Sequence, residues 1–408
     1  MQTNPQPPHV QRRRWALAGV SALGLAGLGR WGWSAAGGSG AADAAAVAAT
    51  ESACSAPAAL DDGWPVNSPA AAGFDASVLC QLLQAVAHDG HNTHAVLVER
   101  SGQLLAEAYF SGSDKPQGAW FSRDVTFTRE TLHDLRSISK SVTGLLVGIA
   151  QGQGKLGPLD RPMLDFFPEH ADLATPERRR ITLQHLLTMS AGLQWDETSA
   201  SYGSSDNSEE RMVQAGDPIR FVLEQPVVAP AGSRWVYSGG TTMLLADIVE
   251  RCTGQKLPAF AQQQLFGPLG IAAFEWRGWK GRTLAFSGLR LRPRDLLKLG
   301  RLMLTGGRWQ GRAIVPADWV AASQRAQLPA QDGWHYGYQW WVAAAGRPDQ
   351  QLGALAGLAG VGNGGQRLIM VPSRDLVVAI TAGRYNQPAN GQPSMALFRA
   401  IAATLNAA

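Results

Sequence analysis

The sequence has few cysteines and only a small net charge. Its three cysteines are too few, and odd in number, for the disulfide framework of a small secreted domain. A disulfide between Cys80 and Cys252 is possible in an oxidising compartment, and the sequence alone leaves this question open. The formal net charge is only +4, and the basic residues are mostly arginines spread along the chain. Because they form no basic stripe or face, we expect no nucleic-acid partner.

Several catalytic signatures are also missing. No glycine-rich loop carries the lysine that cradles phosphates. The Gly-x-Ser-x-Gly elbow of α/β-hydrolases is absent, because the nearest segment, residues 188–192, lacks the first glycine. His88, His91 and His94 are spaced three apart, but a glycine and an asparagine between them would break a helix. We interpret them as solvated loop histidines, so we expect neither a metal nor a cofactor.

The first residues have the pattern of an export signal. Arg12 and Arg13 precede an apolar run, rich in glycine and alanine, that ends near Gly29 and is too short to span a bilayer comfortably. The pattern resembles a twin-arginine signal. We therefore expect residues 1–42 to be an export signal and residues 43–63 a disordered linker. The mature protein is then periplasmic or secreted, with no stable membrane span.

The rest of the chain, residues 64–408, has the periodicity of a folded α+β domain. Apolar residues recur at helical spacing over 76–87. The segments 95–100 and 104–110 have strand character and flank a Ser-Gly turn, which predicts a hairpin. Strands near both chain ends, with helices between them, predict an antiparallel sheet flanked by helices, with an inserted mostly helical subdomain. The further expected ranges are strands at 336–342, 366–371 and 376–381, a last helix at 395–405, an α/β part at 64–150 and 280–408, and a helical part at 151–279.

Ser137 and Lys140 are the strongest candidates for catalysis. They stand three apart at the start of a helix-like run that extends to Gln151, which places both side chains on one face. A serine becomes a nucleophile when a base removes its proton. A lysine can be that base when burial and nearby positive charge, here from Arg136, depress its pKa. The helix N-terminus would also stabilise an oxyanion. Because Ser-x-x-Lys also occurs by chance, the site needs a further residue.

Tyr237 and a glycine-rich segment complete the predicted site. Tyr237 lies on a loop just before an amphipathic helix, where a phenol can carry the proton from the nucleophile to the leaving group. Residues 360–365 hold several glycines beside a strand, which lets a substrate approach the backbone closely. Asn363 and Gly364 in this segment, and Tyr202 elsewhere, are the candidate oxyanion or substrate-binding residues.

With these elements in order, the chain resembles the serine β-lactamase-like family of class C β-lactamases, D-alanyl-D-alanine carboxypeptidases, family VIII esterases and 6-aminohexanoate-dimer hydrolases. The likeness runs from the start of the expected domain to the C-terminus and includes residues 185–193 and 288–295. It implies a β-lactamase/transpeptidase-like fold. It also implies Ser137 as the acylated nucleophile, Lys140 as its activating partner and Tyr237 as the tyrosine of the Tyr-x-Asn motif.

Two departures from that family bear on the substrate. The Tyr-x-Asn motif reads Tyr-Ser-Gly from Tyr237, so its side-chain amide is missing. No Lys-Thr-Gly precedes the last strands, where residues 357–364 are the nearest counterpart. Both losses argue against efficient β-lactam hydrolysis and favour small-molecule esters or linear amides. Trp195, Glu197 and Tyr202 are candidates to line the pocket, and equally to pack or to face solvent.

Two alternatives stay open at this point. One is a non-catalytic member of the same fold that binds or senses a ligand, and the other is a weak β-lactamase or D-alanyl-D-alanine carboxypeptidase. A pure binder has no need of a serine, a lysine and a tyrosine together, so we expect an enzyme, a serine hydrolase. The sequence predicts no oligomeric state.

Overall fold

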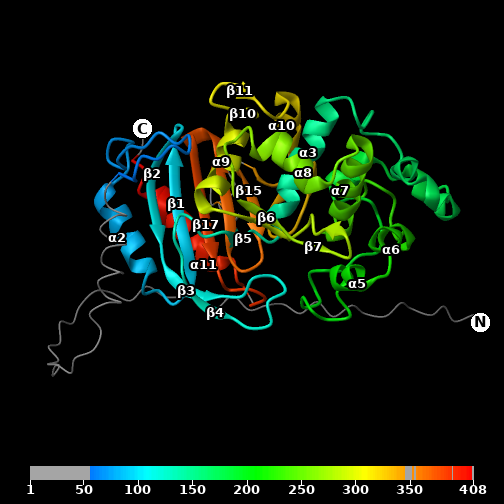
Figure 1. Cartoon of the computed structure of the whole chain (residues 1–408), viewed down its shortest axis with the longest axis horizontal. Helices are drawn as coiled ribbons and strands as arrows, with labels where there is room; N and C mark the ends of the chain where they lie inside the picture. Colours follow the sequence, from blue (N-terminus) through cyan, green and yellow to red (C-terminus); the bar gives the residue numbers. More distant parts are fainter. Residues whose placement is uncertain (1–55, 345–351, 353–354, 388, 407–408) are drawn as a thin grey trace, which may run out of the picture. The chain divides into compact units, whose positions relative to one another are not determined.

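The main sheet of the protein has eight strands. The computed structural model describes residues 56–344, 352, 355–387 and 389–406. The strands of this sheet are β1 (Thr93–Arg100), β2 (Gln103–Tyr109), β12 (Leu328–Pro329), β13 (His335–Tyr336), β14 (Trp341–Ala343), β15 (Gly357–Gly362), β16 (Gln366–Val371) and β17 (Leu376–Ala382). They are antiparallel in the order β12-β13-β14-β15-β16-β17-β1-β2 (Figure 1). The first strands thus pair with the last one, which confirms the predicted α+β sheet from both chain ends.

Helices cover both faces of this sheet. On one face lie α2 (Ala76–Val86) and α11 (Gln392–Ala403), and on the other α3 (Ile138–Gly152) and α9 (Pro293–Leu304). Because side chains alternate along a strand, Leu97 of β1 packs with α3 and α9. Its neighbours Val96 and Val98 pack with α2 and α11. A sheet buried on both faces explains the continuous apolar runs at 95–98 in β1, 368–371 in β16 and 376–380 in β17.

The remaining elements are short. The small strands are β3 (Ser111–Asp114), β4 (Arg123–Thr126), β5 (His133–Asp134), β6 (Phe274–Trp276), β7 (Gly278–Trp279), β8 (Arg282–Thr283), β9 (Leu289–Leu291), β10 (Arg308–Trp309) and β11 (Arg312–Ala313). The other α-helices are α4 (Leu183–Leu187), α5 (Ser208–Gln214), α6 (Pro218–Glu224), α7 (Gly239–Thr253), α8 (Leu257–Ala261) and α10 (Ala317–Ser323). Helices α4 to α8 lie in the chain between α3 and β6, which agrees with the predicted helical insertion.

Local sequence explains where several elements begin and end. The Asp75 carboxylate accepts a hydrogen bond from the Val78 N–H at 3.0 Å and so caps the start of α2. Ser238 caps α7 in the same way, and α7 ends at Gly254, whose φ of 71° lies in the left-handed region. The predicted hairpin turn is confirmed at Ser101 and Gly102, both with positive φ.

One predicted strand is interrupted by a turn. The sequence predicts a single strand over 336–342, whereas the structure has β13 and β14 with a turn between them. The Gly337 N–H donates to the Trp340 carbonyl at 2.8 Å, and Gln339 has a φ of 62°. A Cβ at Gly337 would lie 2.0 Å from the Ser323 carbonyl oxygen. The close approach of a neighbouring segment therefore decides the turn, and alternation along the strand does not reveal it.

The structure answers one open question about single side chains and corrects one expectation. Cys80 is disulfide-bonded while Cys252 is a free thiol, so these two residues do not bridge each other. His88 and His91 are exposed as expected, but His94 is fully buried. The reason is that β1 begins at Thr93, so His94 already belongs to a central strand rather than to the loop before it.

The predicted export signal, residues 1–42, lies outside the described residues, as does the linker up to residue 55. The described end of that linker, residues 56–63, lies against the domain. Arg294 donates to the Ala58 carbonyl at 2.9 Å and to the Asp62 carboxylate at 2.9 Å. The described end of the predicted linker therefore contacts the domain through Arg294.

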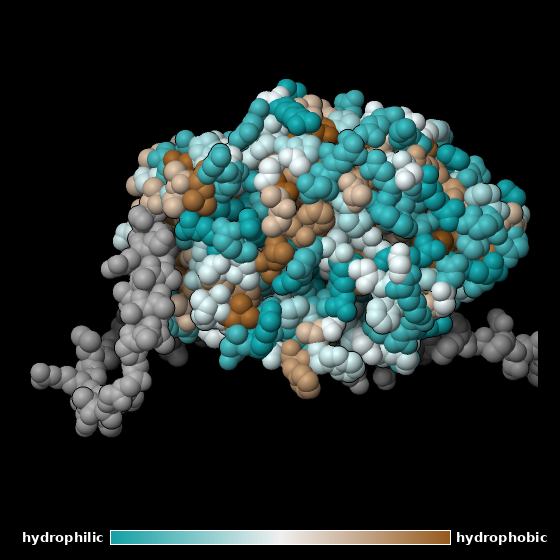
Figure 2. All heavy atoms as spheres, viewed as in Figure 1, coloured by the Kyte–Doolittle hydropathy of each residue, from teal (hydrophilic) through white to brown (hydrophobic). Residues whose placement is uncertain are grey.

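Hydrophilic residues dominate the surface seen in Figure 2, with apolar residues in small patches. Among the described residues, the large apolar side chains with the greatest exposure are Trp120 and Phe121, in the loop from β3 to β4. Within the described part of the chain, no helix has both the length and the apolar character needed to cross a membrane.

Candidate active site

Ser137 and Lys140 meet at the start of α3, as the sequence predicted. Ser137 is the N-cap residue of α3, and the Lys140 Nζ donates to its Oγ at 3.1 Å. The residue before the serine, Arg136, has a φ of 50°, in the left-handed region. The Ser139 hydroxyl donates to the Arg136 carbonyl at 2.7 Å and stabilises that turn. The chain therefore makes a sharp bend that presents Ser137 to the cavity beside it.

Lys140 is buried among acceptors. Its Nζ donates to the Phe286 carbonyl at 3.2 Å and lies 3.5 Å from Glu197 Oε1 and 3.6 Å from Glu209 Oε2. Burial alone would lower the pKa of Lys140, but Tyr237 and the two glutamates outweigh it and raise the pKa above its usual range. The neighbouring acids thus favour the charged form of Lys140, which is opposite to the direction that the sequence predicted.

Arg136, whose charge was expected to lower the pKa of Lys140, interacts with other residues. The Arg136 guanidinium lies 3.5 Å from the Asp134 carboxylate and stacks over the Tyr385 ring, 4.2 Å from its centroid. The electrostatic environment of Lys140 is therefore acidic rather than basic. Sequence spacing could not show this, because Glu197 and Glu209 come from a loop and a helix more than fifty residues away along the chain.

Glu197 and Glu209 form a buried acidic pair beside the lysine. Glu197 Oε2 accepts from the Trp195 indole N–H at 2.7 Å and from the Gly239 backbone N–H at 2.5 Å. Burial and the neighbouring Glu197 raise the pKa of Glu209 to about 8, against the lowering influence of Lys140. The surroundings of Glu209 therefore favour a proton on this acid near neutral pH.

Gly239 stands where the Tyr-x-Asn motif has its asparagine, and it makes room for these acids. A Cβ at this position would lie 2.5 Å from Glu209 Oε2 and 3.2 Å from Glu197 Oε2. The two carboxylates therefore occupy the space next to this backbone position. The glycine that replaces the asparagine therefore provides space for the acidic pair. The sequence showed only that the side-chain amide is absent.

Tyr237 reaches the serine and the lysine from the loop before α7. Its side chain lies close enough to Ser137 and Lys140 for electrostatic interaction with both. The Lys140 Nζ lies 4.7 Å from the centroid of the tyrosine ring, and the Trp341 ring packs on it with centroids 5.6 Å apart. Burial raises the pKa of Tyr237, and the Lys140 ammonium opposes that rise. The structure thus brings together the three residues predicted as catalytic.

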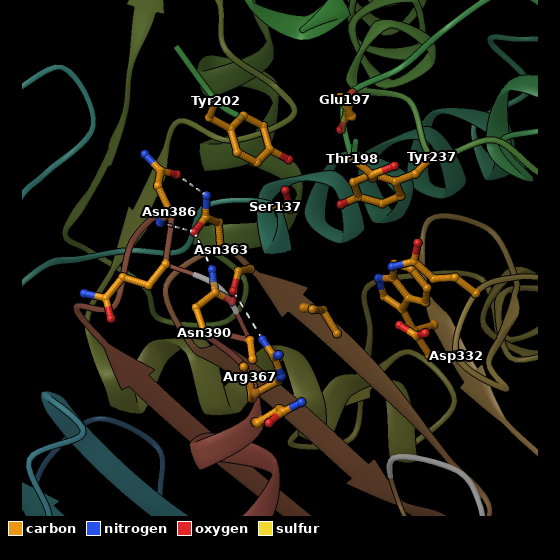
Figure 3. A pocket seen from close by; sticks show the side chains of 18 of the residues that line it. Ser137, Glu197, Thr198, Tyr202, Tyr237, Asp332, Asn363, Arg367, Asn386 and Asn390 are labelled. Carbon is orange, nitrogen blue, oxygen red and sulfur yellow. Dashed lines mark hydrogen bonds between the residues drawn. The ribbon is translucent and has the colours of Figure 1, made fainter. Parts of the chain in front are cut away.

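A cavity of about 610 Å³ opens beside Ser137 and Tyr237 (Figure 3). Its wall combines aromatic rings, amides, an acid and a guanidinium. Residues lining it include Ser137, Glu197, Tyr202, Tyr237, Trp334, Trp341, Val361, Gly362, Asn363, Arg367, Asn386 and Asn390. A cavity of this size holds a small-molecule substrate.

The three predicted binding residues lie differently. Tyr202 lines the cavity, and burial raises its pKa well above its usual value. Asn363 also lines it, but its side chain bonds to Asn386 and Asn390, as the dashed lines in Figure 3 mark. Gly364 is not among the lining residues: it has a φ of 95°, and a Cβ there would lie 2.4 Å from the Tyr385 ring. The structure therefore gives Gly364 a place in the turn behind the wall.

Sequence reasoning missed Arg367, which lines the cavity and is only 8% exposed. Its Nη1 donates to the carbonyls of Gly362 at 3.2 Å and Gln366 at 2.8 Å. Burial lowers the pKa of Arg367 to about 10. The available signal was an arginine near the start of an otherwise apolar predicted strand. Glu209, the other missed residue, lies in a polar stretch that gave no such signal.

Comparison with known proteins agrees with this arrangement. A sequence model of the beta-lactamase family matches residues 81–402. The chain belongs to the beta-lactamase family. This family member is 26% identical over 305 residues to the 6-aminohexanoate-dimer hydrolase of Paenarthrobacter ureafaciens, covering 70% of this chain and 71% of the relative.

A second relative is the esterase EstB of Burkholderia gladioli. It is 29% identical to this beta-lactamase-family protein over 215 residues, which cover 50% of this chain and 53% of the esterase. The match therefore spans about half of that relative. Among solved structures, a penicillin-binding protein homologue from Caulobacter crescentus overlays with a TM-score of 0.61 at 19% identity, over 81% of this chain and 97% of that one. The β-lactamase/transpeptidase-like fold is thus confirmed, and the chain is an enzyme of a family with hydrolase relatives.

Proposed function

We propose that this chain hydrolyses small-molecule esters or linear amides through an acyl-enzyme on Ser137. The observation that carries the proposal is the meeting of three side chains at one cavity. Ser137 Oγ lies 3.1 Å from Lys140 Nζ and interacts with the Tyr237 hydroxyl. The relatives named 6-aminohexanoate-dimer hydrolase and esterase support this reaction class.

Tyr237, in its ionised form, is the proposed base. It takes the Ser137 proton while Oγ bonds to the substrate carbonyl carbon and the carbonyl oxygen receives the electron pair. Tyr237 then gives the proton to the leaving alcohol or amine as the C–O or C–N bond breaks. Water next loses a proton to Tyr237 and attacks the acyl carbon. The bond from that carbon to Oγ then breaks, Tyr237 returns the proton to Oγ, and the acid is released.

Lys140 acts in this proposal as a fixed positive charge. Because Glu197 and Glu209 lie 3.5 and 3.6 Å from its amine and favour the charged form, we assign Lys140 the role of an ammonium and not that of the base. As an ammonium next to Oγ it favours the ionised forms of Ser137 and Tyr237. The lysine therefore lowers the barrier by electrostatics, a role that differs from the base that the sequence predicted.

Backbone N–H groups at the cavity are the proposed oxyanion donors. The N–H groups of the three residues after Ser137 already donate to carbonyls of residues 135–137. This leaves the N–H of Ser137 itself as the donor at the helix start. Strand β14 pairs with β15 only from Gly357 to Ala359. Val361 and Gly362 therefore lie past the end of this pairing, where they line the cavity. An N–H of this segment is the proposed second donor.

The environment of Arg367 favours a substrate that carries a carboxylate. Its Nε has no hydrogen-bond partner, and no carboxylate of the described residues lies within ion-pair distance of it. A buried cation without a counter-charge is costly, and a guanidinium suits a carboxylate geometrically. We therefore propose an anionic group on the acyl or leaving side of the substrate. The missing amide at Gly239 still argues against efficient β-lactam hydrolysis.

The test combines active-site labelling with a substrate panel. A fluorophosphonate probe should label the wild type and not the Ser137→Ala variant, with Ser139→Ala as the neighbouring control. The panel holds nitrophenyl esters, a chromogenic cephalosporin and a linear amide oligomer, each with and without a carboxylate. Failure to label or to hydrolyse any of them, in protein shown to be folded, would favour the non-catalytic binding protein.

Export through a twin-arginine-like signal is our proposal for location. The support is the pattern at Arg12 and Arg13 ahead of the apolar run. Replacing both arginines by lysine should leave the protein in the cytoplasm of a bacterial host, while the wild type reaches the periplasm or the medium. Equal export of both forms would contradict the proposal.

A further inference from the structure

Three buried ionisable side chains outside the cavity converge from three strands. His94 lies on β1, Asp114 ends β3 and His133 begins β5, and their donor atoms all lie within 4.8 Å of one another. They are 0%, 5% and 1% exposed. None of them lines the cavity beside Ser137, and the proposed reaction uses none of them. Such a group of imidazoles and a carboxylate needs its own explanation.

Asn92 determines the proton position on His94. The Asn92 Nδ2 donates to the Ser113 carbonyl at 2.8 Å, and its Oδ1 accepts from the Ser113 N–H at 2.9 Å. These two bonds fix which end of the amide is oxygen. That oxygen lies 3.1 Å from His94 Nε2. Because an amide oxygen only accepts, His94 Nε2 carries the proton, and its Nδ1 presents a lone pair.

A backbone carbonyl determines the proton position on His133. His133 Nδ1 lies 3.0 Å from the Asp134 carbonyl oxygen, which also only accepts. Nδ1 therefore carries the proton and Nε2 presents a lone pair. His94 Nδ1 and His133 Nε2 thus face each other at 2.8 Å with two lone pairs.

We propose that His94 Nδ1, His133 Nε2 and the Asp114 carboxylate bind a divalent transition-metal ion of the Zn²⁺ type. Two facing lone pairs require a cation between them. Two imidazoles and a carboxylate are ligands that Zn²⁺ takes, with water in the fourth position. Histidine ligands also bond their outward N–H to an oxygen, as both rings do here with Asn92 and Asp134. A shared proton is the competing occupant.

The surroundings are shaped for this arrangement. A Cβ at Gly112 would lie 2.3 Å from Asn92 Oδ1, and one at Gly383 would lie 2.6 Å from His94 Cε1. Only glycine at these positions leaves room for the amide and the ring. The Phe127 ring stacks on His94 with centroids 3.9 Å apart and closes one side with an apolar wall. A glycine-bounded space with inward-facing imidazole nitrogens is a suitable metal site.

The metal would act on structure. It would tie β1 and β3 to β5, the strand that leads through two residues to the nucleophile Ser137. Asp114 is also held by the Tyr385 hydroxyl, which donates to it at 3.0 Å. The proposed ion therefore stabilises the fold next to the active site and takes no part in the reaction. This inference is independent of the proposed hydrolase activity.

The experiment measures metal binding directly. The chain is purified with a tag that contains no histidine, stripped with a chelator, and titrated with Zn²⁺ against a chromophoric chelator. Wild type should bind about one equivalent and gain several degrees in Tm. Co²⁺ should give visible absorption bands without a thiolate band. Absence of stoichiometric binding means that the inner nitrogens share a proton, and it overturns the proposal.

Matched variants assign the ion to these residues. Asp114→Asn removes a ligand with little change of shape, and Asn92→Ala removes the oxygen that orients His94. Each should weaken Zn²⁺ binding by about tenfold to a hundredfold. His91→Gln, at an exposed histidine nearby, should bind as the wild type does. An equal loss in His91→Gln, or no loss in Asp114→Asn, would contradict the assignment. If a variant fails to fold, the Zn²⁺ titration of the wild type still tests whether the protein binds the metal.

Discussion

Replacing Lys140 by methionine tests its charge apart from its shape. Methionine keeps the linear apolar stem but leaves Glu197 and Glu209, 3.5 and 3.6 Å from the lost amine, without their cation. Coulomb's law with an effective dielectric constant of about 20 gives about 5 kcal/mol for one such pair. Breaking a buried pair by removing one partner costs about 3 to 5 kcal/mol in practice. We expect Lys140→Met to lose this much free energy of unfolding near neutral pH.

A double variant separates charge balance from catalysis. In Lys140→Met/Glu197→Gln the remaining acid, Glu209, is neutral because burial keeps its pKa raised. The double variant should therefore recover about 2 kcal/mol or more of the stability lost in the single one. It should stay inactive, because the ammonium next to Ser137 is still absent. The control is Lys155→Met, at an exposed lysine, which should change stability by no more than about 0.5 kcal/mol.

The assay is urea unfolding followed by tryptophan fluorescence, with ester hydrolysis measured on the same preparations. We expect Lys140→Met to lower kcat by about 10²- to 10⁴-fold. If Lys140→Met were as stable as the wild type, and the Glu197 change brought no recovery, Lys140 would not be the counter-charge of the acidic pair. A near-normal rate in Lys140→Met would refute its place in the reaction.

Three further predictions concern single side chains. Tyr237→Phe should lower kcat by about 10²- to 10⁴-fold while circular dichroism stays unchanged, because the ring keeps its packing on Trp341; a near-normal rate contradicts the proposed base. The raised pKa of Glu209, about 8, means that the native state binds its proton more tightly than the unfolded chain does, so stability is lost as pH rises from the ordinary glutamate pKa through about 8. Glu209→Gln should flatten that fall in urea titrations between these pH values, and an unchanged slope would show that another group causes it. Arg367→Met should raise KM at least about tenfold for esters bearing a carboxylate and leave neutral esters unaffected, whereas an equal rise for both would exclude charge recognition.

Much of the architecture follows from local sequence. The apolar runs in β1 and β2, the Ser101-Gly102 turn and the apolar run after Ser137 each specify an element through contacts within a few residues. The order of strands, helices and strands then favours one sheet from both chain ends. These features are predictable because each depends on residues that are neighbours along the chain.

In the candidate site, too, local contacts were predictable from the sequence and long-range contacts were not. The sequence by itself determined that Ser137 and Lys140 share a helix face, since one helical turn places them together. The protonation of that lysine was decided only by the fold, which brings Glu197 and Glu209 beside it from distant segments. Charge, burial and proton positions depend on residues far apart in the chain. Spacing along the sequence cannot encode them, because they are properties of three-dimensional packing.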